Sequence, residues 1–96
     1  MNKTLPPAQM HVLNSISLHV YYINERIMTG DYYSAGQALP IAQKSLPAFA
    51  KELKQAGALD VWLNAFVAGG GFLGVSYQFQ FAGEEFRGSM IPRRRP

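Results

Sequence analysis

Cysteine is absent from this chain of 96 residues, and charged residues make up only 16% of it. Without cysteine the protein has no disulfide scaffold, no thiol nucleophile and no thiolate zinc site. Hydrophobic residues, at 48%, are typical of a packed globule and argue against a disordered chain, which needs few apolar groups and much charge. At this length we expect one domain over residues 1–91, followed by a basic tail over residues 92–96.

Apolar runs long enough for a transmembrane helix are also missing. Residues 61–75 form the most apolar segment, but it contains Asn64 and three consecutive glycines. It also falls short of the roughly 20 residues that a spanning helix needs. The N-terminus lacks the continuous apolar core of a secretory signal. We therefore expect a cytoplasmic protein without membrane contact.

Helical periodicity dominates the first third of the chain. Between Leu13 and Ile27 the apolar residues follow one another at alternating spacings of three and four, which predicts a helix over residues 7–29 with one apolar face. Residues 30–47 resemble the second half of a tetratricopeptide repeat, with a Gly-Asp-Tyr turn followed by alanine, leucine and proline at that family's offsets. The resemblance implies an antiparallel helical hairpin packed through small alanines. It covers under a fifth of the chain, in a single copy, and does not assign the family.

A second apolar stripe with helical spacing runs through residues 35–53. Pro40 and Pro47 interrupt this stripe, and a proline inside a helix costs about 3 kcal/mol. We therefore expect a break near Ser45, followed by a further helix. Spacing of the apolar residues then predicts one more short helix over residues 60–68.

After three consecutive glycines the period of the pattern changes from 3.6 to 2. Val75, Tyr77 and Phe79 alternate with polar residues, which predicts a strand with one apolar face over residues 74–81. A four-residue turn at residues 82–85 and a second strand over residues 86–91 complete an antiparallel β-hairpin. The predicted fold class is α+β: an N-terminal antiparallel helical hairpin, one or two short helices, and a C-terminal β-hairpin packed on the helices.

Side chains of the types that can support catalysis (histidine, glutamate and serine) are scattered along the sequence and form no recognisable catalytic motif. His11 and His19 are eight residues apart, or about 12 Å along a helix, so they cannot share a metal ion. Glu84 and Glu85 fall in a predicted turn, where we expect their carboxylates to be solvated. General acid–base catalysis favours a carboxylate whose pKa is shifted by burial or by neighbouring groups. No serine stands in a G-x-S-x-G setting, and no Gly-Lys-Ser/Thr follows the glycines. We expect no enzymatic activity, no cofactor and no bound metal.

Exposed aromatics and an unprotected strand edge favour protein binding instead. We expect a non-catalytic protein-binding module, an inhibitor or adaptor, that also forms a homodimer through an edge strand at residues 74–81 or 86–91. Its profile is similar to that of inhibitors encoded by phages and mobile elements, including anti-CRISPR proteins, although no motif is shared. The predicted protein-binding residues are Tyr22, Arg26, Tyr33, Tyr77, Phe79 and Phe86.

The alternative is a nucleic-acid-binding accessory protein. The chain carries a net charge of +3 and ends in an arginine run, and each arginine can neutralise one phosphate. The predicted nucleic-acid-binding residues are Lys51, Lys54, Arg87, Arg93, Arg94 and Arg95. Deleting residues 92–96 separates the two functions, because only nucleic-acid binding should depend on the tail.

Overall fold

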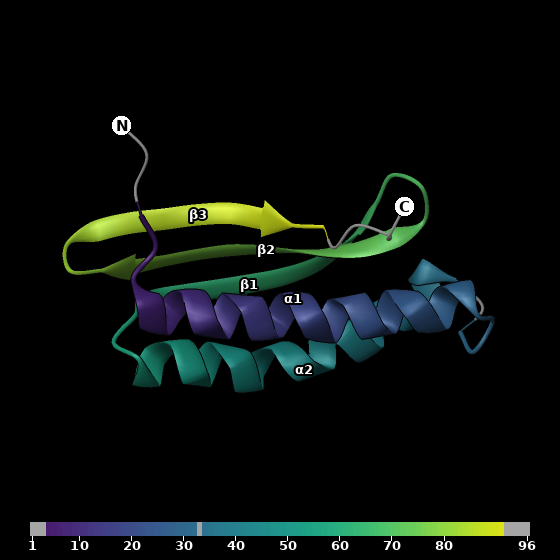
Figure 1. The fold of residues 1–96 in the computed structure, drawn as a ribbon, viewed down its shortest axis with the longest axis horizontal. Helices are drawn as coiled ribbons and strands as arrows, with labels where there is room; N and C mark the ends of the chain where they lie inside the picture. Colours follow the sequence, from purple (N-terminus) through teal and green to yellow (C-terminus); the bar gives the residue numbers. More distant parts are fainter. Residues whose placement is uncertain (1–3, 33, 92–96) are drawn as a thin grey trace.

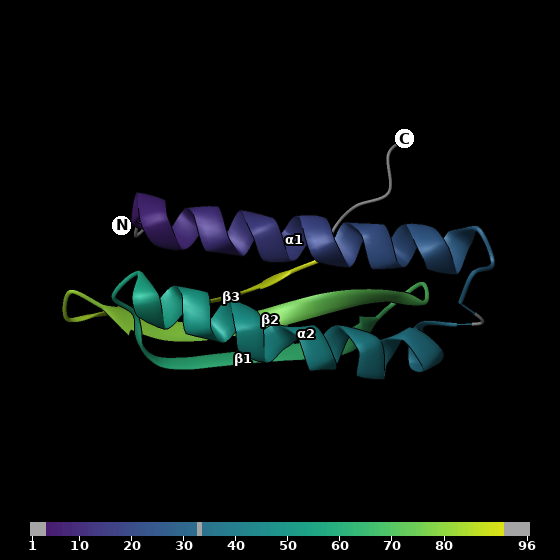
Figure 2. The same ribbon diagram turned by 90° about the horizontal axis from the view of Figure 1, so that it is seen from below.

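Two helices and a three-stranded antiparallel sheet form two layers in the computed structural model, which describes residues 4–32 and 34–91. The helices and strands, in chain order, are α1 (Pro7–Met28), α2 (Ala35–Gln55), β1 (Leu59–Ala68), β2 (Phe72–Phe81) and β3 (Glu84–Met90). Both helices cover the same face of the sheet, with α1 packed on β2 and α2 packed mainly on β1 (Figures 1 and 2). The predicted α+β class is confirmed.

Helix α1 forms as its periodicity predicts. It begins with Pro7, whose missing N–H costs nothing in the first turn, and it ends one residue before the predicted boundary. Its apolar stripe is buried against α2 and the sheet. The buried apolar residues of this helix are Val12, Leu13, Ile16, Val20 and Ile23.

Helix α2 is continuous, so the predicted break near Ser45 is wrong. Ser34 caps its start by accepting a hydrogen bond from the Gln37 N–H. Pro40 and Pro47 lie seven residues apart on the exposed side of the helix. The carbonyl groups that lose their helical partners there face solvent, where water satisfies them. Exposure of both prolines therefore explains why the helix bends instead of breaking.

Residues 59–68 form strand β1, so the predicted short helix over residues 60–68 is also wrong. In register with β2, Leu63 and Ala65 lie opposite Tyr77 and Val75, on the face that the helices cover. Trp62 and Phe66 therefore lie on the other face. Both faces of β1 carry apolar side chains, so the alternation that identifies a half-buried strand is absent.

Strand β2 lies in the middle of the sheet, paired with β1 on one side and β3 on the other. The predicted β-hairpin is thus part of a larger sheet. Its turn is two residues long instead of four: Ala82 and Gly83 have φ of 53° and 80°, as the favoured hairpin turns require. Because β2 is flanked on both sides, residues 74–81 are not an edge strand, and the homodimer predicted through them is ruled out.

Asn24 of α1 joins the helical layer to the sheet at the end of β3. Its Nδ2 donates a hydrogen bond to the Leu73 carbonyl oxygen (3.1 Å), and its Oδ1 accepts one from the Leu73 N–H (2.8 Å). Both residues are buried. The last β3 partner along β2 is Val75, opposite Met90, and Leu73 is the next residue of β2 whose backbone N–H and C=O groups point toward the β3 side. A side-chain amide thereby continues the ladder where β3 ends.

Candidate functional site

The predicted aromatic binding residues on the hairpin face the interior. Phe79 is fully buried, and Phe86 is 6% exposed and stacks on Phe79 with ring centroids 5.4 Å apart. Tyr77 is half-buried, and its ring lies against Gly88 of β3. The helices thus cover the apolar face that we expected a partner to cover. Phe79 and Phe86 are core residues, and their assignment to a binding surface is wrong.

Tyr22 and Arg26 lie close together on the exposed side of α1. Tyr22 is 60% exposed, one of the most exposed large side chains in the described part of the chain. Arg26 donates a hydrogen bond from Nη1 to the Tyr32 hydroxyl (3.2 Å), and its Cζ lies 5.9 Å from the centre of the Tyr32 ring. Sequence reasoning missed Tyr32, whereas the predicted Tyr33 lies outside the described residues. Tyr22 and Arg26 are both exposed, but the Arg26 guanidinium already interacts with Tyr32.

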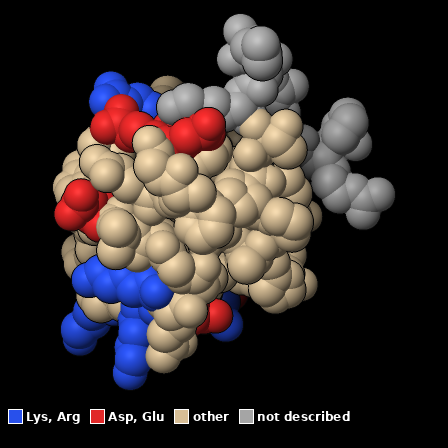
Figure 3. Space-filling model, turned by 90° about the vertical axis from the view of Figure 1, so that its left-hand side faces the viewer, with Lys and Arg blue, Asp and Glu red and all other residues tan. Residues whose placement is uncertain are grey.

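The predicted basic residues do not form one surface. Lys51 and Lys54 are exposed near the end of α2, whereas Arg87 is exposed on β3 and pairs with Glu85 (2.6 Å). In Figure 3, Lys and Arg side chains gather at the lower part of the molecule, and a smaller group at the top lies among acidic side chains; the surface between the two groups is mostly uncharged and carries acidic atoms at its left edge. Residues 93–95 lie outside the described residues.

A histidine and a serine meet where α1 packs on α2. His19 Nε2 lies 2.9 Å from Ser45 Oγ, which donates its own proton to the Ala42 carbonyl oxygen (2.7 Å). Ser45 therefore accepts from the imidazole and cannot pass its proton to it, as a nucleophile would have to. The His19 ring also packs against Phe49. This arrangement is a polar bridge between helices. In the described part of the chain no three His, Asp or Glu side chains lie close enough to hold a metal ion.

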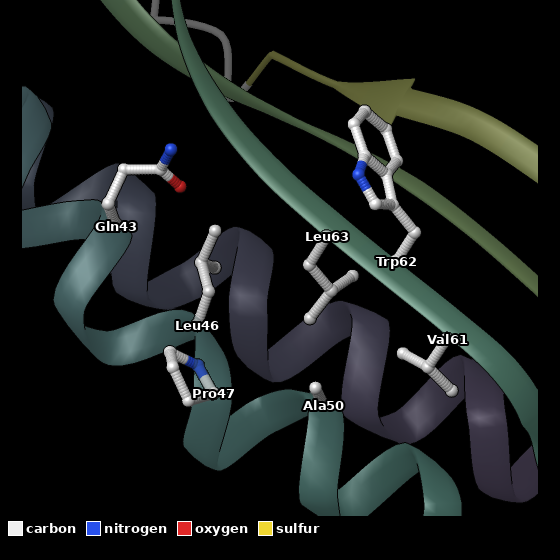
Figure 4. Close-up of a pocket in the computed structure, with 7 residues that line it drawn as sticks. All are labelled: Gln43, Leu46, Pro47, Ala50, Val61, Trp62 and Leu63. Carbon is white, nitrogen blue, oxygen red and sulfur yellow. The ribbon is translucent and has the colours of Figure 1, made fainter.

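An open groove of about 270 Å³ runs between α2 and β1 (Figure 4). Val61 and Leu63 point from β1 toward the helix, whereas Trp62 points away from it. At one end Gln43 accepts a hydrogen bond from the Ala65 N–H (3.1 Å) and donates one to Asn64 (3.2 Å). The residues that line the groove are Gln43, Leu46, Pro47, Ala50, Val61, Trp62 and Leu63. None of these side chains can serve as an acid, a base or a nucleophile.

The face of the sheet that points away from both helices carries the most distinctive surface, and we call it the outer face. Trp62 is 52% exposed on it and Ile91 is 50% exposed beside its end, while Phe66 and Phe72 are half-buried. Phe66 and Ile91 both contact Gly74, where an added Cβ would come within 2.7 Å and 3.0 Å of them.

Polar side chains complete the outer face in rows set by the strand register. Asn64, Ser76 and Ser89 form one row across the three strands, between Trp62 and Phe66. In the next row Trp62 lies beside Gln78, which lies beside Arg87. The outer face thus combines exposed apolar side chains with neutral hydrogen-bonding groups and one arginine. Sequence reasoning missed it because β1 was assigned to a helix.

Comparison of the chain with protein-family models, with curated proteins and with solved structures gives no match. Neither α1 nor α2, over the residues described, combines the length and the apolar character that crossing a membrane requires.

Proposed function

We propose that the protein is a non-catalytic protein-binding module and that the outer face is its binding surface. One observation carries the proposal: β1 is apolar on both faces, as strands covered on both sides are, yet α1 and α2 cover only one of them. Apolar area left in water favours association with another surface by about 25 cal/mol per Å². A partner that covers Trp62, Phe66 and Ile91 would supply the missing layer.

The composition of the outer face supports a protein as the partner. Tryptophan and arginine are the residues that most often dominate binding energy, and here Trp62 and Arg87 occupy the same cross-strand row. Asn64 and Ser89 offer neutral hydrogen-bonding groups within reach of the apolar side chains, the mixture found in non-obligate interfaces. The charge of Arg87 is balanced by Glu85. This face therefore offers no cationic track to a phosphate backbone, and the module would act as an inhibitor or adaptor.

Replacing an exposed aromatic on each candidate surface tests the proposal. Trp62→Ser alters the outer face, and Tyr22→Ser is the matched control because both side chains are more than half exposed. Each variant, with the wild type, is used to capture proteins from cells of the native host, and the captured protein is then titrated in purified form. Because Trp62→Ser removes the sole tryptophan, binding of all three forms is measured by titration calorimetry, and Trp62 fluorescence serves as a second readout for the wild type and Tyr22→Ser.

We expect the Trp62→Ser variant to bind the captured protein at least about 30-fold more weakly, the loss of a hot-spot residue of about 2 kcal/mol. The Tyr22→Ser variant should bind like the wild type. Equal binding by the wild type and the Trp62→Ser variant would refute the outer face as the binding surface. Loss of binding in the Tyr22→Ser variant alone would assign the interaction to the predicted Tyr22–Arg26 pair on α1.

A second candidate function, nucleic-acid binding, is supported by the exposed side of α2. Lys44, Lys51 and Lys54 are all exposed on this helix, at spacings of seven and three that place them on neighbouring positions of one side. Three contacts to phosphates would make binding strongly dependent on salt. The triple Lys→Gln variant and deletion of residues 92–96 should each weaken binding to DNA or RNA. Binding that is unaffected by both changes, or by salt, would exclude this function.

A further inference from the structure

The groove between α2 and β1 lies against the β1 edge of the sheet. Three consecutive residues of β1 line it, Val61, Trp62 and Leu63, and successive residues of a strand point to opposite faces. Figure 4 shows this alternation, with Val61 and Leu63 directed toward α2 and Trp62 directed away from it. A cavity that contacts side chains on both faces must pass along the edge of the strand. Whatever occupies the groove therefore meets the β1 backbone as well as the helix.

The register shows which backbone groups of β1 face the groove. Ala65 donates its N–H to Gln43 of α2 (3.1 Å), so this group points away from β2. The register with β2 is regular from Trp62 to Ala68, and the groups that point outward recur at every second residue. Leu63, two residues before Ala65, therefore also directs its N–H and C=O groups away from β2, into the groove. An extended backbone placed there is in position to exchange hydrogen bonds with Leu63.

Both ends of this open stretch of backbone are closed. Gln43 covers the Ala65 N–H at one end. At the other end the register is irregular between Leu59 and Trp62, and Asp60 has a φ of 52°. Such features prevent a long strand from pairing with an edge. The volume of the groove, about 270 Å³, lies close to the lower limit of about 300 Å³ for ligand sites. The groove therefore fits a short extended segment and not a second sheet.

The side of α2 that lines the groove continues to a lysine. Because the short connection at residues 56–58 joins α2 to β1, the two elements run in opposite directions, and the later residues of α2 lie beside the earlier residues of β1 (Figure 2). Gln43 and Ala50 line the groove from one side of the helix, and Lys54 lies on the same side one turn further on. The groove thus has an ammonium group beyond its Val61 end.

The charges around this end favour an acidic occupant. Lys51 and Lys54 are both exposed in the last turns of α2, against Asp60 at the start of β1, and Glu52 projects to the side of α2 opposite Gln43. Figure 3 views the molecule from this end and shows Lys and Arg side chains gathered at the lower part, where α2 lies. The residues that line the groove carry no charge. An acidic side chain therefore complements the end of the groove, and apolar side chains complement its walls.

We infer that the groove binds a short extended segment of a partner protein as an added strand beside Leu63. The segment residue opposite Leu63 shares its face, so its side chain enters the groove between Leu63 and Ala50, where an aliphatic β-branched residue fits. Two residues further toward the start of β1, on the same face, an acidic side chain of the segment reaches Lys54. The inference rests on the proposed protein-binding function, but it uses the strand edge and the helix, whereas that function uses the outer face.

Selection from a displayed library of random peptides of about seven residues, enough to form one strand, tests the groove in the full chain. Ala50→Phe fills the groove from the helix, and Ala48→Phe, exposed on nearly the opposite side of α2, is the matched control. Circular dichroism and thermal unfolding check that both variants keep the fold. We expect the selected peptides to carry an aliphatic residue and, two positions away, an acidic residue. Their affinity, measured by titration calorimetry, should fall at least about tenfold in Ala50→Phe and stay unchanged in Ala48→Phe.

A charge variant and the backbone give separate readouts. Lys54→Glu should weaken binding of the selected peptides at least about threefold. Lys44→Glu makes the same change of charge on another side of α2, away from the Val61 end, and should have a smaller effect. Amide hydrogen exchange of the wild type with a bound peptide should show new protection at the Leu63 N–H. The Ala65 N–H is its internal control, because Gln43 already bonds to it.

Several results would overturn the inference. These are a selection that enriches no peptide, selected peptides that bind Ala50→Phe as tightly as the wild type, and a bound peptide that leaves the Leu63 N–H unprotected. A protein bound through the outer face alone would lose affinity in Trp62→Ser and keep it in Ala50→Phe. Failure of the groove and failure of the proposed function are therefore distinguishable.

Discussion

The link between Asn24 and Leu73 gives the sharpest test of the fold. Asn24→Ala removes two hydrogen bonds and leaves the N–H and C=O groups of Leu73 without partners, in a residue that is fully buried. Each buried group left unsatisfied costs about 1–3 kcal/mol, so we expect a loss of about 2–4 kcal/mol in the free energy of unfolding. Small domains have only about 5–15 kcal/mol in total. The melting temperature should fall by at least about 10 °C.

Urea unfolding followed by circular dichroism measures this loss, with Asn14→Ala as the matched control. Asn14 is exposed on the same helix, so its replacement should change stability by no more than about 0.5 kcal/mol. Amide hydrogen exchange supplies a local readout, since the Leu73 N–H should lose protection in Asn24→Ala. If the two variants unfold at the same urea concentration, Asn24 does not connect α1 to the sheet, and the position of α1 over β2 would need another cause.

An aspartate at the same position adds a pH-dependent arm. Asn24→Asp would bury a carboxylate beside the Leu73 carbonyl oxygen, and burial raises the pKa of such a group. The folded state then holds its proton more tightly than the unfolded state does. Stability should therefore be greatest at acidic pH, below the pKa of an exposed aspartate, and decrease as the pH rises through the raised value. A variant whose stability, relative to wild type, does not change with pH would contradict the burial of this side chain.

Two further substitutions test the sheet and α2. Gly74→Ala should destabilise the protein by about 1–3 kcal/mol, because the new Cβ would come within 3.0 Å of the Met90 carbonyl oxygen as well as meeting Phe66. Gly69→Ala is its control, since nothing lies within 4 Å of an added Cβ there, and equal effects in thermal unfolding would show that Gly74 is not enclosed. Pro47→Ala should raise stability by about 1–3 kcal/mol, because alanine restores a helical hydrogen bond at an exposed position. A lower melting temperature for Pro47→Ala would mean that the bend in α2 is needed for its packing on β1.

The wrong prediction of a helix at β1 and the proposal of the outer face as a binding surface both follow from one feature, the apolar side chains on both faces of β1. A strand covered on one side normally alternates, and this alternation correctly identified β2, where Val75 and Phe79 are buried and Gln78 and Gln80 are exposed. In β1 the outward positions hold Trp62 and Phe66, so alternation is lost and helical spacing appears by coincidence. The same two side chains form part of the proposed binding surface. A local pattern that fails to match its own environment is expected where a surface serves recognition.

Periodicity in the sequence was sufficient for those elements whose environment is simple. The stripe of α1 has one apolar side and one polar side, so its bounds and its buried face follow from side-chain spacing alone. Strand β3 was predicted with a shorter range, and its turn residue Gly83 was recognised within a longer turn. The absence of cysteine and of nucleophile motifs is likewise evident from the sequence alone.

Tertiary structure alone decided which surfaces remain open. The hydrogen bonds between Asn24 and Leu73 join residues 49 positions apart, and no local pattern indicates such a pair. Whether Phe79 and Phe86 bind a partner or form the core depends on where α1 lies, and whether a strand is an edge depends on what pairs beside it. Side-chain spacing determines which face of an element is apolar, because that face is a property of neighbouring residues. What covers the face is a property of the whole chain, because the covering groups come from distant segments.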